Sequence, residues 1–318
     1  ALLALGLAMN RSKRILSGMI VMSTMVGLFF VNCVVELLMT SVPPQPELPD
    51  SFDKRTKYQV VRDFQRNGVD AAPHMCALHV YRAHFGKNIL PLSGMPNKRI
   101  VYCNEAGTRA HFQSDRYGFH NPNSIYDAAR ISKRIMLLGD SFVDGACVPE
   151  GSDLGNQLRN QGLSVFNLGC GGNGPLAMTG TWREYKDLVK PEIVVWFYFE
   201  GNDLLNISEE KNTLLRKYLD PAYSQNLLHR DEERMAELAT LLEKTARQYK
   251  TTKPLHGDNA TSNQRPFLFN LLTLYHIREY FGVTSRGINL KAYEQTFLKF
   301  YAQARRENQK VLFVYLPS

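Results

Sequence analysis

Cysteine is scarce in this 318-residue sequence, and its five cysteines form no metal-binding pattern. They include no Cys-x-x-Cys pair and no Cys/His spacing of the kind that holds zinc, so the sequence predicts no metal site. Cys33 lies in a long apolar run. For Cys76, Cys103, Cys147 and Cys170, free buried thiols are the default expectation, and a Cys76–Cys103 bridge is the alternative if this part of the chain is exported.

Concentrated charge of one sign is also missing. The 38 Lys and Arg exceed the 30 Asp and Glu, which gives a net charge of +8, but the basic residues are scattered. Nucleic-acid binding proteins gather Lys and Arg on one face or stripe, so we expect no nucleic-acid partner. An anionic membrane surface or an acidic polysaccharide fits the excess charge better.

One apolar run is long enough to cross a bilayer. Residues 15–39 contain a single charge, Glu36. Arg11, Lys13 and Arg14 flank the run on its N-terminal side, whereas no basic residue follows it before Lys54. The positive-inside rule then predicts a cytoplasmic tail (1–14), a single transmembrane helix (15–40) and an extracytoplasmic remainder on the periplasmic side of the cell membrane. A buried core helix and a cleaved signal peptide are the alternatives, but the run has no polar stripe and no small-x-small cleavage site.

The rest of the chain shows no internal repeat and divides at a proline-rich segment. Residues 41–52 include four prolines and are predicted to form a stiff spacer. Residues 53–130 are interpreted as an irregular, partly β subdomain. In the domain 131–318, apolar runs alternate with helical stretches, which predicts an α/β fold with a parallel sheet. The expected strands are 134–138, 164–168, 193–199 and 311–316, and the expected helices are 154–161, 176–188 and 290–308. An insertion at about 208–287 contains a helix at 231–250, expected to serve in packing or as a lid.

Polar, glycine-bearing loops follow three successive predicted strands. The first, GDSFVDG from Gly139, places Ser141 at a strand-to-helix turn, where a nucleophile would be exposed near backbone N–H groups. Taken alone, this serine is more simply a helix cap. The second runs from Asn167 through Gly172 and offers N–H donors to an oxyanion; it lacks the lysine and spacing of a phosphate loop. The third contains Asn202, either an amide donor or an ordinary turn residue.

Together these loops resemble a known family. GDSFVDG is similar to block I of the SGNH (GDSL-like) hydrolases, residues 167–172 to block II, and residues 201–203 to block III. Residues 115–122 (DRYGFHNP) resemble the lead-in of bacterial members. The resemblance implies a three-layer α/β/α sandwich, Ser141 as nucleophile, and an oxyanion hole made by the N–H groups of Ser141 and Gly172 and the Asn202 side chain. It also implies supporting roles for Asp140, Asn167 and Asp203, and no cofactor.

The implied chemistry is ester hydrolysis through an acyl-enzyme, on acyl or acetyl esters of an extracytoplasmic glycan or lipid. An O-acetyltransferase that uses the same serine is one alternative, and a non-catalytic envelope protein that keeps the fold is another. The fourth block of the family, Asp-x-x-His, follows the last strand. Because this sequence reaches Ser318 at the end of that strand, the resemblance implies that the histidine base lies beyond it and that this chain alone hydrolyses esters weakly or not at all.

None of the eight histidines follows a predicted core strand, so all are interpreted as surface or packing residues.

Overall fold

The computed structural model describes residues 10–40, 49, 51–76, 89–127, 133–251, 274 and 289–317. Its contacts divide the chain into two compact units, Ala1–Pro49 with Thr261–Gly287, and Asp50–Ala260 with Ile288–Ser318. The first unit contains helix α2 (Arg11–Thr40), whose segment Arg11–Val35 is long and apolar enough to cross a membrane. The helix begins at Arg11, so the basic residues assigned to a tail form its first turn.

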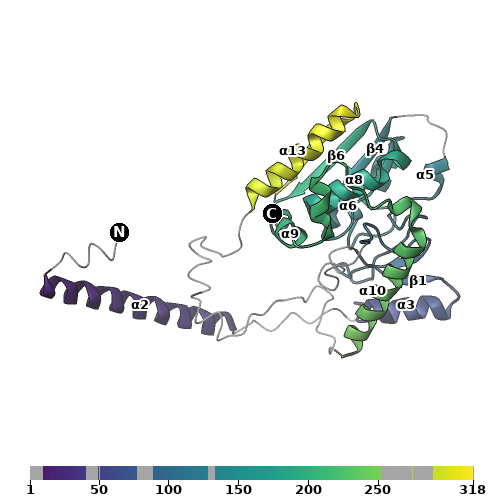
Figure 1. The fold of residues 1–318 in the computed structure, drawn as a ribbon. Helices are drawn as coiled ribbons and strands as arrows, with labels where there is room; N and C mark the ends of the chain where they lie inside the picture. Colours follow the sequence, from purple (N-terminus) through teal and green to yellow (C-terminus); the bar gives the residue numbers. More distant parts are fainter. Residues whose placement is uncertain are drawn as a thin grey trace. The chain divides into compact units, whose positions relative to one another are not determined.

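The second unit is built on a four-stranded parallel sheet (Figure 1). Its strand order is β5-β4-β6-β7, and all neighbouring strands are parallel. The strands are β4 (Arg134–Leu138), β5 (Ser164–Asn167), β6 (Ile193–Phe199) and β7 (Lys310–Leu316). The predicted α/β fold with a parallel sheet is therefore confirmed, with β5 ending one residue earlier and β7 starting one residue earlier than predicted.

Helices cover this sheet because its strands are apolar on both sides. Successive strand residues point to opposite faces. Met136 belongs to the core cluster that includes helices α8 (Pro175–Val189) and α13 (Leu290–Arg306), which contact each other (Figure 1). Its neighbour Leu137 belongs to a second cluster, which includes residues of α6 (Ser141–Asp144) and α7 (Leu154–Asn160).

A smaller sheet precedes the parallel sheet in the same unit. Its strands are β1 (Ala71–Pro73), β2 (Arg99–Val101) and β3 (His111–Gln113). Helix α3 (Lys57–Arg66) precedes these strands in the chain, and helix α5 (Ser124–Asp127) follows them. A capping box between Thr56 and Gln59 starts α3. Strand β1 is parallel to β2, and β2 is antiparallel to β3.

The predicted insertion starts inside a helix. Helix α9 (Asp203–Glu210) runs through residue 208 and is followed by the 3₁₀ helices η1 (Leu214–Leu219) and η2 (Leu227–His229). The predicted helix 231–250 is confirmed as α10 (Asp231–Thr251), whose Leu238 and Leu241 join the core. The remainder of the insertion, apart from Leu274, lies outside the described residues.

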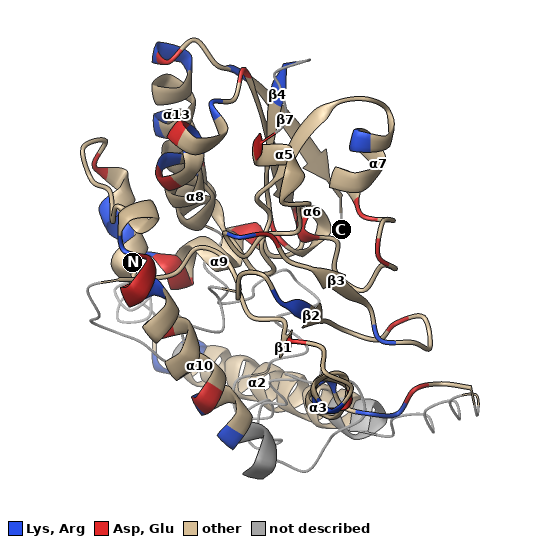
Figure 2. Cartoon of the chain, turned by 90° about the vertical axis from the view of Figure 1, so that its right-hand side faces the viewer, with Lys and Arg blue, Asp and Glu red and all other residues tan. Residues whose placement is uncertain are grey.

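Charged residues of both signs are interspersed along helices α10 and α13 (Figure 2). On α10, for example, Glu243 pairs with Arg247 one turn later. Such i,i+4 pairs of opposite charge stabilise a helix surface modestly.

The disulfide expectations were wrong. The structure pairs Cys76 with Cys170 and Cys103 with Cys147, which contradicts both the free thiols and the Cys76–Cys103 alternative. Each bridge joins the small-sheet region to a loop of the parallel sheet, across 94 and 44 residues of sequence. The pairing depends on how the two sheets pack, which sequence spacing does not encode.

Candidate active site

Three loops meet at the carboxyl edge of the parallel sheet. They follow β4, β5 and β6, which are neighbours in the sheet and point the same way. Backbone and side-chain hydrogen bonds connect them. The Cys170 N–H of the second loop donates to the Gly139 carbonyl of the first at 3.2 Å, and Asn202 of the third loop donates to Asp140 of the first at 3.1 Å. The predicted convergence of the loops is therefore seen in the structure.

The first loop presents Ser141 at the start of α6. Gly139 is required here, because a Cβ atom would lie 2.4 Å from the Val143 side chain. Asp140 caps the helix by accepting the Phe142 N–H at 3.1 Å. The half-buried Ser141 makes no side-chain hydrogen bond to the described part of the chain, so its hydroxyl is available. Helix α6 has only four residues, so its local N–H groups matter more here than a helix macrodipole.

The second loop, Gly169 to Gly174, is called the glycine loop below. A Cβ atom on Gly169 would lie 2.6 Å from the Asp144 backbone nitrogen, so only glycine allows the loop to pack against α6. Gly172 adopts a φ of 82°, in the left-handed region that favours glycine. It is partly exposed next to Gly171, whose N–H is already used by Asp144 at 3.1 Å.

Asn167 ties the first two loops together. Its Nδ2 donates to the Val143 carbonyl at 2.6 Å, and its Oδ1 accepts the Gly169 N–H at 3.0 Å. Its own N–H donates to Asn121 Oδ1 at 2.8 Å. Asn121 is in turn held by the buried carboxylate of Asp115 at 3.0 Å. The DRYGFHNP segment thus acts on the site through Asn167, a structural role that the sequence resemblance did not specify.

The third loop carries Asn202 and Asp203 into α9. Asn202 caps the start of the helix without a side-chain cap bond, and its amide donates to Asp140 instead. Asn202 Oδ1 is buried and has no hydrogen-bond partner within the described ranges. The Asp203 carboxylate accepts the Phe199 N–H at 3.0 Å. The amide predicted to face an oxyanion is therefore at the site, although one of its protons is engaged by Asp140.

Two acidic residues of these loops, Asp140 and Asp203, are poorly solvated. Burial raises the pKa of Asp140 above its ordinary value. Burial and, second, the nearby Asp140 charge raise the pKa of Asp203 to about 8. A protonated Asp203 would leave the edge with less negative charge, which favours an oxyanion there.

Among the described residues, no histidine lies next to Ser141 to act as its base. His74 and His120 are buried, consistent with packing roles, and both contact Asp144 through its side chain or its carbonyl. His229 is exposed at the end of η2. His79, His84, His256 and His276 lie outside the described residues. No described histidine forms a hydrogen bond with Ser141.

A metal-like cluster exists at His74, Cys76 and Asp144, whose ligand atoms lie within 4.8 Å of one another. No sequence pattern indicated it, because Asp144 lies 70 residues after His74. Cys76 is bonded to Cys170, which removes its thiolate as a ligand. The second such group includes both Cys103 and Cys147, which are likewise bonded to each other.

Comparisons with known proteins give little beyond this geometry. No family model and no curated protein matches the chain. Among solved structures, a mutant of the esterase AlinE4 is similar at 20% identity and a TM-score of 0.21, over 39% of this chain and 75% of that chain. A likeness of this size carries no weight for function, so the functional proposal depends on the residues described above.

Proposed function

We propose that this chain is a membrane-anchored serine ester hydrolase of the SGNH type. The observation that carries the proposal is the hydrogen-bonded convergence of three loops at one sheet edge. Ser141 has a free hydroxyl there, and the Asp140–Asn202 and Cys170–Gly139 contacts place the other two loops beside it. Helices contribute residues to both hydrophobic clusters that pack against the sheet, which supports a three-layer α/β/α arrangement.

In this proposal, Ser141 Oγ attacks an ester carbonyl and the alcohol leaves. The N–H groups of Ser141 and Gly172 and the amide of Asn202 stabilise the negative oxygen, and water then releases the acid. Asp140, Asn167 and Asp203 support the three donors through the contacts described above. In the SGNH hydrolases that the three loops resemble, the general base is the histidine of an Asp-x-x-His block.

The substrate is proposed to be an acyl or acetyl ester of an extracytoplasmic glycan or lipid. Helix α2 supports this placement, since basic residues occupy its first turn and its apolar segment could span the membrane. The hydrolase unit would then face the periplasm.

A fluorophosphonate probe tests the nucleophile on the full-length protein, because it reacts with activated serines whatever the substrate. We expect labelling of the wild type and none of Ser141→Ala. Ser208→Ala is the matched control, since Ser208 is a half-buried serine on α9 outside the site and should label like the wild type. Equal labelling of Ser141→Ala and wild type would rule out Ser141 as nucleophile.

The fate of the acyl group separates a hydrolase from an acetyltransferase. Incubation with an acetyl donor and a sugar acceptor should release free acetate. Accumulation of acetylated sugar with little acetate would instead assign transferase activity to the same serine.

A further inference from the structure

Two ring side chains of the small sheet lie side by side next to the glycine loop. The parallel register of β1 and β2 pairs Pro73 with Val101, so the residues that follow, His74 and Tyr102, become neighbours. The His74 N–H donates to the Val101 carbonyl at 2.7 Å, which continues this pairing. The two rings stack with their centroids 3.6 Å apart.

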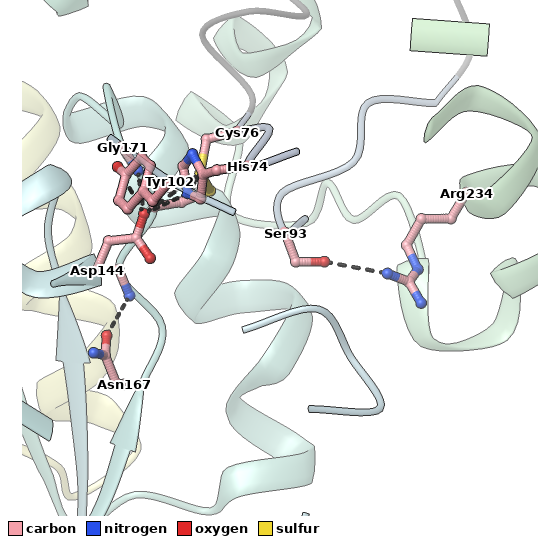
Figure 3. Close-up of a disulfide and its surroundings, with 10 residues drawn as sticks. His74, Cys76, Ser93, Tyr102, Asp144, Asn167, Gly171 and Arg234 are labelled. Carbon is pink, nitrogen blue, oxygen red and sulfur yellow. Dashed lines mark hydrogen bonds and ion pairs between the residues drawn. A yellow bond between two sulfur atoms is a disulfide. The ribbon is translucent and has the colours of Figure 1, made fainter. Parts of the chain in front are cut away.

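Both rings contact one oxygen of Asp144, at the end of α6 (Figure 3). His74 Nε2 lies 2.7 Å from Asp144 Oδ2, and the Tyr102 hydroxyl donates to the same oxygen at 3.2 Å. The Gly171 N–H of the glycine loop is the third donor, at 3.1 Å. This oxygen therefore joins the small sheet, α6 and the glycine loop.

Asp144 and His74 are buried and Tyr102 is half-buried, which makes the hydrogen bonds of Asp144 strong determinants of geometry. Asp144 is 3% exposed and His74 is 5% exposed. A carboxylate removed from water is stable only when donors replace the solvent. Burial and, second, the charge of Asp144 raise the pKa of Tyr102 well above its ordinary value, so the phenol keeps its proton and donates.

The two disulfides bracket this cluster. Cys76 follows His74 by two residues and is bonded to Cys170, the residue before Gly171. The other bridge joins Cys103, directly after Tyr102, to Cys147, three residues after Asp144. Each residue that contacts Asp144 Oδ2 is thus within two positions of a cross-linked cysteine, so the four segments have little freedom to separate.

The far end of the glycine loop is also fixed by a carboxylate. Glu210 of α9 is buried and accepts the N–H groups of Gly174 and Leu176 at 2.8 Å each and of Ala177 at 3.1 Å. Gly172 lies between this anchor and the Asp144 anchor. Its N–H direction is therefore set by two contacts that it does not make itself.

We propose that Asp144, with His74 and Tyr102, is a positioning residue that fixes the Gly172 N–H as an oxyanion donor. This inference rests on the proposed function, because Gly172 matters only if an oxyanion forms. Asp144 acts through Gly171 and does not touch the reacting atoms. Loss of its hydrogen bonds lets the glycine loop reorient, which weakens stabilisation of the transition state more than binding of the substrate.

The test combines ester kinetics with backbone hydrogen exchange on the full-length protein. Tyr102→Phe removes one donor and keeps the stacked ring. Asp144→Asn keeps an oxygen that can accept the Gly171 N–H, whereas Asp144→Leu keeps none. With p-nitrophenyl acetate as substrate, we expect kcat to fall about 10-fold in Tyr102→Phe and about 100-fold in Asp144→Leu, with Asp144→Asn between them and KM nearly unchanged. Amides of residues 169–174 should exchange faster in the same order.

Tyr218→Phe is the matched control, because it also removes a buried tyrosine-to-carboxylate hydrogen bond, 2.7 Å to Glu184, outside the site. It should leave kcat and exchange of the glycine loop unchanged. Unchanged loop exchange in Tyr102→Phe and Asp144→Asn would overturn the positioning role, and so would faster exchange with unchanged kcat. Turnover that survives Ser141→Ala would instead remove the proposed function, a separate failure that the Ser141 variant reveals by itself.

Discussion

Replacement of Asp203 by Asn should change how the stability of the protein depends on pH. Asp203 is 1% exposed, and one carboxylate oxygen accepts the Phe199 N–H. Its other oxygen has no hydrogen-bond partner among the described residues. Burial, reinforced by Asp140, raises the pKa of Asp203 to about 8 from a reference value of 3.8. The asparagine side chain of the Asp203→Asn variant could accept the same N–H but cannot ionise.

The direction of this pH dependence follows from which state of the protein, folded or unfolded, holds the proton of Asp203. Below the unfolded pKa of 3.8, both states are protonated and Asp203 contributes no pH dependence. Between that value and about 8, the folded protein keeps the proton that the unfolded chain releases, so stability falls as pH rises. One proton corresponds to about 1.4 kcal/mol per pH unit, so the loss accumulated by pH 7 has a ceiling of roughly 4 kcal/mol.

Urea unfolding in mild detergent between pH 5 and pH 8 would measure this slope. The two tryptophans, Trp182 and Trp196, are both buried and should report unfolding by fluorescence. Glu210, whose pKa burial also raises to about 8, contributes the same background to both proteins. The free energy of unfolding of Asp203→Asn minus that of wild type should therefore rise by about 1 kcal/mol per pH unit.

Asp187→Asn on α8 is the control, because this side chain is 87% exposed and its replacement should leave the slope unchanged. A difference for Asp203→Asn that is flat or falls with pH would show that Asp203 is ionised in the folded protein. The view of the sheet edge as a site with little negative charge would then be wrong.

Two further predictions concern the stability of the same unit. Replacing either disulfide by a pair of serines should lower the free energy of unfolding by about 4 to 5 kcal/mol. The reason is the loop-closure entropy that the unfolded chain regains, for cysteines separated by 94 and 44 residues. Cys33→Ser, at the free cysteine, is the control and should not change the stability of this unit. Urea unfolding with and without a thiol reductant checks this, and equal stability of bridged and reduced protein would contradict it. Phe300→Ala should lower the free energy of unfolding by about 3 to 5 kcal/mol, because the fully buried ring packs on both tryptophans. Tyr301→Ala, on the exposed side of α13, should lower it by less than about 1 kcal/mol. Equal costs for the two variants would refute the assigned core face of α13.

The parallel sheet could be predicted because its determinants are local. The run from Arg134 to Leu138 is short, apolar and followed by Gly139, and the same holds for the runs before Gly169 and Gly201. These patterns identify strands and loops without knowledge of distant contacts. The terminal residues of a strand are set by ladder pairing, which explains why β7 starts one residue earlier than predicted, at Lys310, which pairs with Ile193.

The surroundings of the site could not be predicted in the same way. His74 and Asp144 are 70 residues apart, and a lone histidine in an irregular stretch carries no local sign of its partner. From the sequence, Glu210 falls within the predicted insertion. In the structure its buried carboxyl group accepts the N–H groups at the start of α8. The prediction of the disulfide pairing was wrong for the same reason. Each of these contacts depends on the packing of one element against another, which periodicity and spacing do not report.

The structure gives the small sheet a direct connection to the chemistry proposed for the large one. Strands β1 and β2 are parallel, and the residues that follow them, His74 and Tyr102, contact Asp144. Strands β4 and β5 are also parallel, and the segments that follow them contain Asp144 itself, in α6, and Gly171, whose N–H donates to it. A parallel strand pair places the residues that follow its two strands side by side, so it can hold both against one oxygen with few adjustable torsions. In the proposed positioning role, the region that precedes the parallel sheet supports the glycine loop through these contacts.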